Sequence, residues 1–378
     1  MAKLGEVCKL NMGQSPDSSS YNDTGDGIPF FQGNADFGEV HPNIRVWCNA
    51  PTKIAHPGEI LISVRAPIGA MNIADCECCI GRGLASISAD EAICTTKYLW
   101  YGISSKIEEL NAKGTGSTFK AINKKTLEET EIPIRDLMEQ KRIAANLDRV
   151  TALISLRKQQ LAKLDELVKA RFVEMFGDFE FNPKEFAVYH LCELCDVGSS
   201  KRIYQEEQSI SGIPFLKVAD LNELIDTGKY SCSTFIPLER YEQLLHKELT
   251  PTENDILITS RGTLGKCYIV QSDDEFYFQD GMISWLSNFS PKVSSIYISY
   301  LFAQPYIQKQ IESLQAGSTV AYLSIAMLKK INVILPPKKL QDDFATFVEH
   351  VDQQKQTVQQ SLEKLELMKK ALMQEYFG

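Results

Sequence analysis

The chain is an internal duplication, and this feature constrains its fold more than any other. Two copies of one pattern follow each other, and their matching blocks occur in the same order. The offset between copies is 201 residues in the later blocks, but 185 and 196 in the earlier ones, so insertions in the first part of each copy are expected to form loops. The matching blocks are 28–30 with 213–215, 59–69 with 255–265, 116–118 with 317–319, and 176–177 with 377–378.

Each copy has two unlike parts. The first part contains short apolar runs separated by Gly and Pro, such as 59–64, which predict strands joined by turns, with an occasional helix at 97–110. The second part is different, because 134–176 contains neither Gly nor Pro. This pattern predicts a compact mixed α/β module followed by one long helix, twice over.

The apolar residues of both long segments recur at alternating spacings of four and three, which is typical of a coiled-coil seam. Arg157 interrupts the first stripe, and Lys355 and Lys369 interrupt the second. One such stripe is more often a buried helix in a globular core, but two stripes of roughly forty residues favour helices that pair with each other. The predicted seam residues are Ile143, Leu147, Val150, Ile154, Leu161, Leu164, Val168, Phe344, Val348, Val351, Val358, Leu362, Leu365 and Leu372.

The sequence therefore predicts an α+β architecture in which two duplicated mixed α/β domains are separated by two long helices. Equivalent units tend to pack about a pseudo-two-fold axis, and such an axis makes the paired helices an antiparallel coiled coil. A forty-residue helix spans about 60 Å at its usual rise, so partial overlap holds the domains some tens of ångströms apart. The expected domains are 1–135 and 179–336, and the expected spacer helices are 136–178 and 337–378.

Composition narrows the setting. The 378 residues are 44% hydrophobic and 24% charged, and no apolar run approaches the ~18–20 residues of a membrane helix. The N-terminus has no apolar signal segment, so the ten cysteines are expected to be reduced thiols. These features predict a cytoplasmic protein with no membrane partner.

The residue patterns of common enzymes are missing. The sequence contains no phosphate-binding Gly-x-x-x-x-Gly-Lys-Ser/Thr loop, no Gly-x-Gly-x-x-Gly, no His-Glu-x-x-His, and no Asn/Asp-Pro-Pro-Tyr/Phe block of an amino-methyltransferase. The pairs Cys76/Cys79 and Cys192/Cys195 together resemble a four-thiolate zinc site, but they occupy non-equivalent places in different copies and are far apart in the chain. We expect no catalytic residue, no metal and no cofactor on this chain.

Two similar but non-identical modules at a fixed separation suit a molecule that recognises two unlike targets. DNA offers such targets, because its grooves repeat every ~34–36 Å and its base edges bind Arg, Lys, Asn and Gln. Arg65 and Arg261 each follow a predicted strand and precede a Gly turn, where they contact DNA or, equally, form a salt bridge that holds the turn. Further candidates for DNA contact are Asn34, Lys120, Lys201, Arg202 and Lys217, and the Gly-Ser-Thr loop residues Ser117, Thr118, Ser318 and Thr319.

Purely structural interpretations of these loops, without DNA contact, stay open. A Gly-Ser-Thr loop offers donors to phosphate but also caps helices, and an exposed pair such as Lys201–Arg202 more commonly serves solubility. The net charge of -9 is unfavourable for a DNA-binding protein, and none of the four segments exceeds a net charge of +1. We therefore expect weak DNA binding by the chain alone, with a partner that supplies much of the phosphate neutralisation.

Taken together, the chain resembles the specificity (S) subunit of a Type I restriction-modification system. The resemblance covers the whole chain and is carried by the 60–65 and 256–261 blocks with their glycines, the two Gly-Ser-Thr loops, and the stretches 132–143 and 334–341. The chain departs from the family at Ile132-Pro133-Ile134-Arg135, where a Pro-Pro is usual, and at Gly81, which is opposite Gln279.

The resemblance implies two target recognition domains that each recognise one half of a split, asymmetric site in double-stranded DNA. It implies that the paired helices set the spacing and dock modification (methyltransferase) subunits, two in number, which hold S-adenosylmethionine, and that restriction subunits add ATP- and Mg-dependent cleavage. This chain would then be a non-catalytic subunit. The alternative is a duplicated adaptor that binds protein and no DNA.

Overall fold

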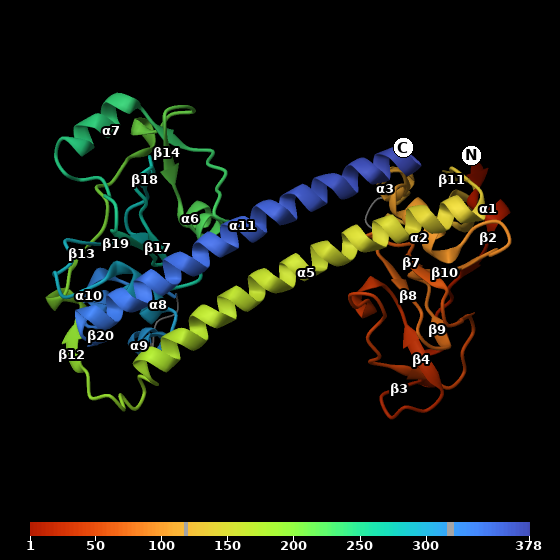
Figure 1. Ribbon diagram of the computed structural model, residues 1–378, viewed down its shortest axis with the longest axis horizontal. Helices are drawn as coiled ribbons and strands as arrows, with labels where there is room; N and C mark the ends of the chain where they lie inside the picture. The colour runs from red at the N-terminus through yellow and green to blue at the C-terminus, as the bar shows by residue number, and fades with distance from the viewer. Residues whose placement is uncertain (117–119, 316–320) are drawn as a thin grey trace. The chain divides into compact units, whose positions relative to one another are not determined.

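The computed structural model describes residues 1–116, 120–315 and 321–378 (Figure 1). It divides into two compact units, and each long helix contributes one part to each unit. Unit 1 comprises 1–160 and 358–378, and unit 2 comprises 161–357. Among the described residues, no helix combines the length and the apolar character that crossing a membrane requires.

Unit 1 contains two main sheets. The first is antiparallel with the strand order β2-β10-β7-β8, and its central strand β7 is buried at every residue. The second has the order β3-β5-β4-β9-β6, in which β4 and β9 run parallel and Phe30 pairs with Cys79. The strands are β1 Ala2–Lys3, β2 Cys8–Met12, β3 Tyr21–Asn22, β4 Ile28–Phe31, β5 Trp47–Cys48, β6 Ile54–Ala55, β7 Ile60–Ser63, β8 Met71–Ile73, β9 Cys78–Ile80, β10 Leu84–Ala89 and β11 Glu131–Ile132.

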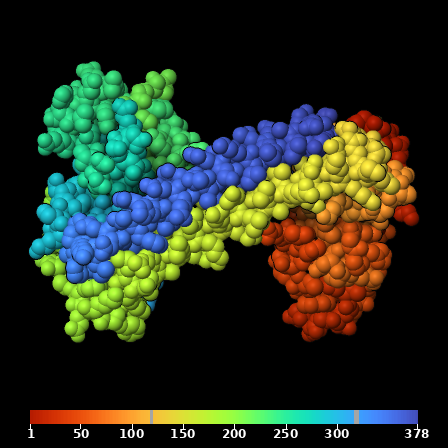
Figure 2. Space-filling view, viewed as in Figure 1, coloured from red at the N-terminus to blue at the C-terminus, as the bar shows by residue number. Residues whose placement is uncertain are grey.

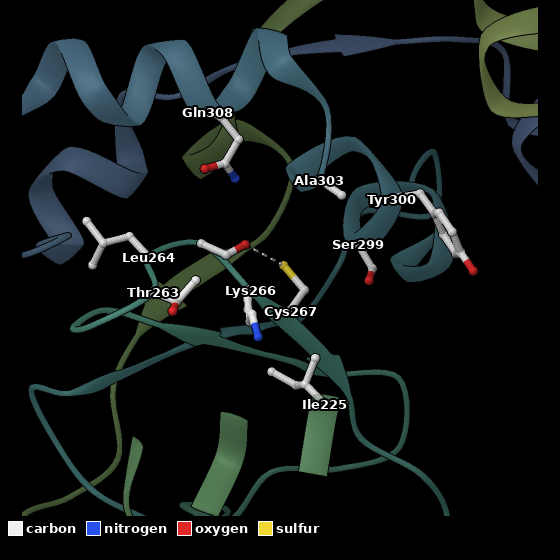
Figure 3. A pocket seen from close by; sticks show the side chains of 10 residues that line it. Ile225, Thr263, Leu264, Lys266, Cys267, Ser299, Tyr300, Ala303 and Gln308 are labelled. Atoms are coloured by element: carbon white, nitrogen blue, oxygen red, sulfur yellow. Dashed lines mark hydrogen bonds between the residues drawn. The ribbon is translucent and has the colours of Figure 1, made fainter. Parts of the chain in front are cut away.

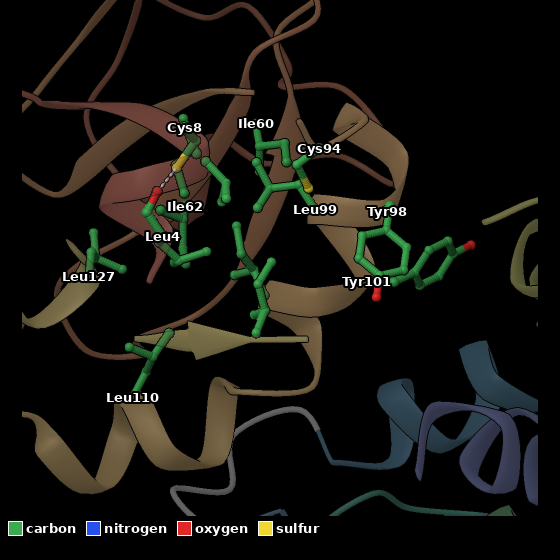
Figure 4. Packing of buried hydrophobic residues seen from close by; sticks show 14 of the residues in the cluster. Leu4, Cys8, Ile60, Ile62, Cys94, Tyr98, Leu99, Tyr101, Leu110 and Leu127 are labelled. Atoms are coloured by element: carbon green, nitrogen blue, oxygen red, sulfur yellow. Dashed lines mark hydrogen bonds between the residues drawn. The ribbon is translucent and has the colours of Figure 1, made fainter. Parts of the chain in front are cut away.

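Short helices cover the first sheet of unit 1. The core joins β7 and β10 to α2 and to both long helices. Figure 4 shows part of this core, including Ile62 of β7 and Leu99 of α2. Tyr98 is fully buried in this core and donates its hydroxyl to the carbonyl of Pro133, and its ring lies 4.9 Å, centroid to centroid, from the tilted ring of Phe377. The helices are α1 Leu4–Val7, α2 Thr96–Ser104, α3 Ile107–Lys113 and α4 Lys124–Glu128, with 3₁₀ turns η1 Ser18–Ser20 and η2 Asn34–Asp36.

The single helix expected at 97–110 is two helices. Its first part, α2, ends at Ser104, and a tight turn through Ser105 and Lys106 starts α3. The turn redirects the chain so that Leu110 is fully buried in the unit 1 core. The apolar periodicity continues across this turn, which is why the sequence alone did not predict the break.

Unit 2 repeats the first sheet of unit 1. Its strand order β13-β19-β16-β17 matches β2-β10-β7-β8, and the parallel pair β14–β18 matches β4–β9. The elements are β12 Ala187–His190, η3 Leu191–Glu193, β13 Asp196–Gly198, η4 Gln205–Glu207, β14 Ile213–Leu216, α6 Val218–Thr227, β15 Phe235–Ile236, α7 Leu238–Leu245, β16 Ile256–Thr259, β17 Cys267–Ile269, β18 Tyr277–Phe278, β19 Ile283–Ser287, α8 Ser295–Phe302, α9 Pro305–Leu314, α10 Ile325–Lys329 and β20 Asn332–Leu335.

The duplication extends to individual hydrogen bonds. Gln140 and Gln341 are both fully buried, and each carboxamide oxygen accepts from a backbone N–H at 2.9 Å, of Thr95 and Ser294 respectively. Each amide nitrogen also donates to two carbonyls, at 2.8 Å in unit 1 and at 3.0 and 2.8 Å in unit 2. A buried amide with all of these partners locks each long helix to its module.

The two copies differ in secondary structure where the residue offset between them changes. We expected loops there, but residues 216–255 of unit 2 contain the helices α6 and α7. Leu221 and Leu224 of α6 pack into a core cluster with Phe276 and Phe278, so the insertion adds an apolar layer. The expectation of loops was wrong because an insertion with an apolar helical face is stabilised by burial.

The long helices are α5 (Leu137–Phe176) and α11 (Lys338–Phe377), of 40 residues each. Within unit 1, Lys158 of α5 pairs with Glu366 of α11 at 3.2 Å. Within unit 2, Lys355, one of the residues that interrupt the apolar stripe, pairs with Asp165 at 2.7 Å. Of the seam residues, Leu161, Leu365 and Leu372 are half-buried and the others are buried.

An aromatic cluster fastens the helices to the unit 2 module. Phe172 and Phe176 of α5 lie 5.3 and 5.4 Å, centroid to centroid, from Phe344 of α11. Tyr297 of α8 is 5.0 Å from Phe176. In unit 1 the corresponding position is taken by Phe377 against Tyr98, so the same contact recurs with the roles of the two helices exchanged.

Candidate nucleic-acid interface

The unit 1 rim is defined here as Gln14, Gln32, Arg65, Arg82 and Lys120, five exposed polar side chains that backbone pairing brings together. Arg65 lies two residues after the end of β7 and forms a β-bridge with Ala121. The next residue along, Ala66, donates its N–H to the carbonyl of Lys120 at 2.9 Å. The two cations predicted from the sequence are therefore on adjacent segments.

The turn between β9 and β10 brings a third cation to the same rim. The N–H of Val64 donates to the carbonyl of Gly83 at 2.9 Å, which places Arg82 beside the end of β7. The N–H of Arg82 donates to the hydroxyl of Ser15 at 3.2 Å, and Gly81 donates to Phe31 at 2.8 Å. Gln14 precedes Ser15 and Gln32 follows Phe31, so these bonds place both glutamines beside the turn.

The unit 2 rim is defined as Lys201, Arg202, Lys217, Arg261 and Gln279. The same backbone bonds build it: Gln279 donates to the carbonyl of Leu216 at 2.9 Å, and Leu323 donates to that of Ser260 at 3.0 Å. Lys217 follows Leu216 and is exposed. The side chains differ, since Gln279 takes the place of Gly81.

Arg202 of the unit 2 rim is held by an ion pair. Its Nε lies 2.8 Å from Oδ2 of Asp280, while 65% of the arginine side chain and 19% of the aspartate side chain are exposed. The pair leaves the two terminal nitrogens of the guanidinium free of this contact. A guanidinium held in this way suits bidentate donation to O6 and N7 of guanine.

The two interpretations of Arg65 and Arg261, DNA contact and a salt bridge that holds the turn, are not equally supported. Within the described residues, neither arginine has a carboxylate oxygen within 4.0 Å, so the structure gives no support to the salt-bridge alternative. Arg261 instead lies over the ring of Tyr322 at 5.1 Å, a cation–π contact that positions the guanidinium. DNA contact by either arginine remains a prediction.

Some candidates are less well placed. Asn34 is half-buried at the start of η2, where its carbonyl accepts from the N–H of Phe37 at 3.1 Å. Ser117, Thr118, Ser318 and Thr319 lie outside the described residues. The helices that follow these loops, α4 and α10, are capped by Asn123 and Ser324.

Sequence reasoning missed Arg82, Gln14, Gln32 and Asp280. The alignment of Gly81 with Gln279 pointed to the turn that contains Arg82 and Asp280, but it named neither residue. The proximity of Arg82 to Arg65 depends on the pairing of β7 with β10 in register, Leu84 with Ser63.

A separate cavity of about 360 Å³ lies in unit 2 (Figure 3). It is lined by Thr263, Lys266, Cys267, Tyr300 and Gln308 among others, with neither a histidine nor a carboxylate in the lining. Burial raises the pKa of the Cys267 thiol, so the thiol stays protonated at neutral pH. Lys266 is engaged by Asp226 at 2.6 Å.

The cysteines form no metal site in the described chain. Cys78 and Cys79 are buried in β9, whereas Cys192 is exposed in unit 2. Within 1–116, 120–315 and 321–378, no group of three or more His, Cys, Asp or Glu side chains is arranged to hold an ion.

The two modules share backbone bonds but differ in their polar rims. A comparison of the chain with family models also finds two modules. The model described as Type I restriction modification DNA specificity domain matches 1–166 and 183–367. The chain belongs to this family.

Individual relatives agree. The chain is 43% identical to the putative type I restriction enzyme MjaX specificity subunit of Methanocaldococcus jannaschii over 161 residues, which cover 43% of the chain and 38% of that protein. It is 26% identical to the MjaVIII specificity subunit of the same organism, with 73% of the chain and 68% of that protein covered. The match thus spans less than half of the first relative and about two thirds of the second.

A solved structure shows the same fold. The S subunit of a type I restriction-modification system from M. genitalium matches 100% of this chain with 95% of its own, at a TM-score of 0.61 and 17% identity. At this identity the likeness concerns the fold alone. It extends over both modules and both long helices.

Proposed function

We propose that the chain is the sequence-specific DNA-recognition subunit of a type I restriction-modification complex, and that each module recognises one half of a bipartite, asymmetric site. The observation that supports this most is the pair of non-identical rims on matching backbones. Arg65, Arg82 and Lys120 make the unit 1 rim cationic, while unit 2 places Gln279 and the Asp280–Arg202 pair at the corresponding turn. Unlike side chains on like frames suit unlike half-sites.

The two long helices are proposed to form one antiparallel coiled coil related by a pseudo-two-fold axis. Contacts inside each unit support this: in unit 2, Asp165 meets Lys355 and Phe172 lies against Phe344, so residue numbers rise on one helix as they fall on the other. In unit 1, Phe377 shares a core with Ile143 and Leu147. The coiled coil would set the gap between the half-sites.

The proposal that the coiled coil sets the gap between the half-sites has a direct test. Deleting seven residues from each helix, about 10 Å of helix, keeps the seam in phase and should change the gap between the half-sites while both halves keep their sequence. An unaltered gap would reject the proposal that the coiled coil sets this distance.

The same helices are proposed to dock two modification subunits. Apolar side chains that the seam does not use are exposed in the part of the helices that belongs to unit 1: Leu153 is 46%, Leu156 58%, Leu367 68% and Met368 52% exposed. The surfaces of α5 and α11 are visible in Figure 2. Exposed apolar groups of this kind are typical of partner interfaces. The methyl donor S-adenosylmethionine would be bound by those partners, as would ATP and Mg by restriction subunits, in the cytoplasm.

The function as a DNA-recognition subunit is tested by co-purification with a modification subunit, followed by selection from random double-stranded DNA at fixed salt. Salt must be fixed because phosphate contacts dominate affinity. The expected result is a bipartite motif that the complex enriches and the single chain enriches weakly. A complex that forms without enriching any sequence would support the adaptor, a duplicated protein-binding module, instead.

A further inference from the structure

A carboxylate is an unexpected neighbour for an arginine on a surface that binds DNA, because it repels phosphate. Asp280 lies on the turn between β18 and β19, and its Oδ2 is 2.8 Å from Nε of Arg202. The aspartate side chain is mostly covered, whereas the arginine side chain is largely exposed. The acid is thus on the protein side of the pair, and the guanidinium faces solvent.

The loop that carries this arginine is fixed to the same turn by side-chain hydrogen bonds. The buried hydroxyl of Ser200 donates to the carbonyl of Phe278 at 2.7 Å. The hydroxyl of Ser199 donates to the carbonyl of Ile283 at 3.0 Å and accepts from the N–H of Gly281 at 3.2 Å. The loop and the turn therefore form one braced structure.

The residues on either side of Arg202 are also held in place. The N–H of Lys201 donates to the hydroxyl of Tyr277 at 2.8 Å, and that hydroxyl donates to the carbonyl of Lys201 at 3.2 Å. Tyr277 is fully buried, and Ile203 is buried in the same core cluster. Because both neighbours are fixed, the position of the guanidinium depends on the arginine side chain and on its contact with Asp280.

The contact through Nε decides which edge of the guanidinium points outward. A hydrogen bond at Nε leaves the edge formed by Nη1 and Nη2 outside the ion pair. That edge matches O6 and N7 of guanine in a bidentate pair. An arginine that is ordered before DNA arrives also loses less rotamer entropy on binding than a free arginine does.

The charge of the pair favours a base edge over a phosphate. Arg202 and Asp280 together carry no net charge, so the pair adds little to the attraction of the DNA backbone. A phosphate against the guanidinium would lie near the carboxylate, which repels it. Guanine instead presents uncharged acceptors at O6 and N7. The pair is therefore suited to specificity more than to overall affinity.

The same place in the frame joins two loops in unit 1. When the two copies are aligned by their strand pairing, Arg202 corresponds to Ser15 and Asp280 to Arg82. The N–H of Arg82 donates to the hydroxyl of Ser15 at 3.2 Å. The frame thus brings both aligned positions into contact, and unit 2 uses this contact for an arginine and a carboxylate.

We propose that Asp280 is a positioning residue for base recognition by unit 2: it holds Arg202 with its terminal nitrogens toward a guanine and keeps the guanidinium away from phosphate. The inference rests on the proposed function, in which unit 2 recognises one half of the site. Asp280 acts through Arg202 and contacts no base itself. Its removal therefore lowers specificity without lowering the affinity for DNA as a whole.

The test uses the full chain in complex with the modification subunit and selection from random double-stranded DNA. Asp280→Ala should reduce the preference for guanine about tenfold, at the base pair that Arg202→Ala also relaxes, with the other half and the gap unchanged. Asp280→Asn keeps an acceptor for Nε and should lose less. Binding to DNA without the motif should be as tight or tighter, because a negative charge is removed.

A control of equal charge separates positioning from electrostatics. Asp273→Ala removes an exposed aspartate of the same unit and should leave the guanine preference intact. Equal loss of preference in Asp273→Ala and Asp280→Ala would overturn the positioning role. A fall in binding to DNA without the motif would also overturn it, since that result indicates damage to the whole rim.

A double variant shows whether Asp280 acts through Arg202. Once Arg202 is replaced by Ala, the further change Asp280→Ala should cause no additional loss of preference. An additional loss would mean that the carboxylate contacts a base directly, which contradicts the inference. If the unmodified complex selects a bipartite motif that Asp280→Ala leaves intact, the inference fails while the proposed function stands. If the unmodified complex selects no motif, the proposed function fails, and the inference that rests on it fails too.

Discussion

The two rims differ far more than the frames that present them. In unit 1, Gly81 donates to Phe31 at 2.8 Å, and in unit 2 Gln279 donates to Leu216 at 2.9 Å, so the backbone bond is preserved while the side chain changes. The next residue is Arg82 in one unit and Asp280 in the other. Both copies retain the hydrogen bonds that build the turn, while their outward side chains differ, as the proposed recognition of two unlike half-sites requires.

The largest effect, on unfolding free energy, is expected from substitutions in the frames, that is, in the buried hydrogen bonds that hold each module together. Gln140→Leu would leave the N–H of Thr95 and two carbonyls without partners in a buried site, at a cost of about 3 kcal/mol in unfolding free energy. Gln341→Leu should cost about as much, since its bonds match. Denaturant unfolding measures both, with the exposed Gln160→Leu as control. A large difference between the two variants would show that the frames are not equivalent.

The rims should show a smaller effect that is confined to one half-site. Arg202→Ala should cost about 1–3 kcal/mol at one base pair, expected to be a G·C pair, because the held guanidinium is lost. Arg82→Ala removes an arginine of the unit 1 rim and should alter the other half alone. Selection from random DNA with each complex measures both. Relaxation of the same half by both variants would contradict the assignment of one rim to each half.

The smallest effect is expected from a cation that contacts phosphate. Lys120→Ala should weaken binding to all sequences about equally and lower the slope of log K against log salt by about one. Titrations at several salt concentrations measure that slope. A sequence-dependent loss would instead make Lys120 a base contact, and the unit 1 rim would then extend further than proposed.

Local patterns predicted some of this molecule well. The absence of Gly and Pro between 134 and 176, with the four-three apolar spacing, predicted a long helix, and α5 covers Leu137–Phe176. The repeated block at 59–69 predicted a strand before Arg65, and β7 ends two residues earlier, at Ser63. Both features depend on residues close together in the chain, where periodicity is informative.

The missed features depend on contacts between distant residues. Arg202 and Asp280 are separated by 78 positions, and their ion pair exists because Ser200 bonds to Phe278 at 2.7 Å. Arg82 joins the rim through the bond of Val64 to Gly83. The break between α2 and α3 serves the burial of Leu110 in a core that the sequence pattern does not specify. In each case the tertiary pairing, rather than the local pattern, decides the position.

The central claim is that each module recognises its own half of the site independently. Its most direct test replaces 179–336 with the equivalent module of a relative that has a different target, and repeats the DNA selection with the modification subunit present. The account predicts a motif in which one half is unchanged, the other half is new and the gap is conserved. A change in both halves would contradict independent modules on a common frame.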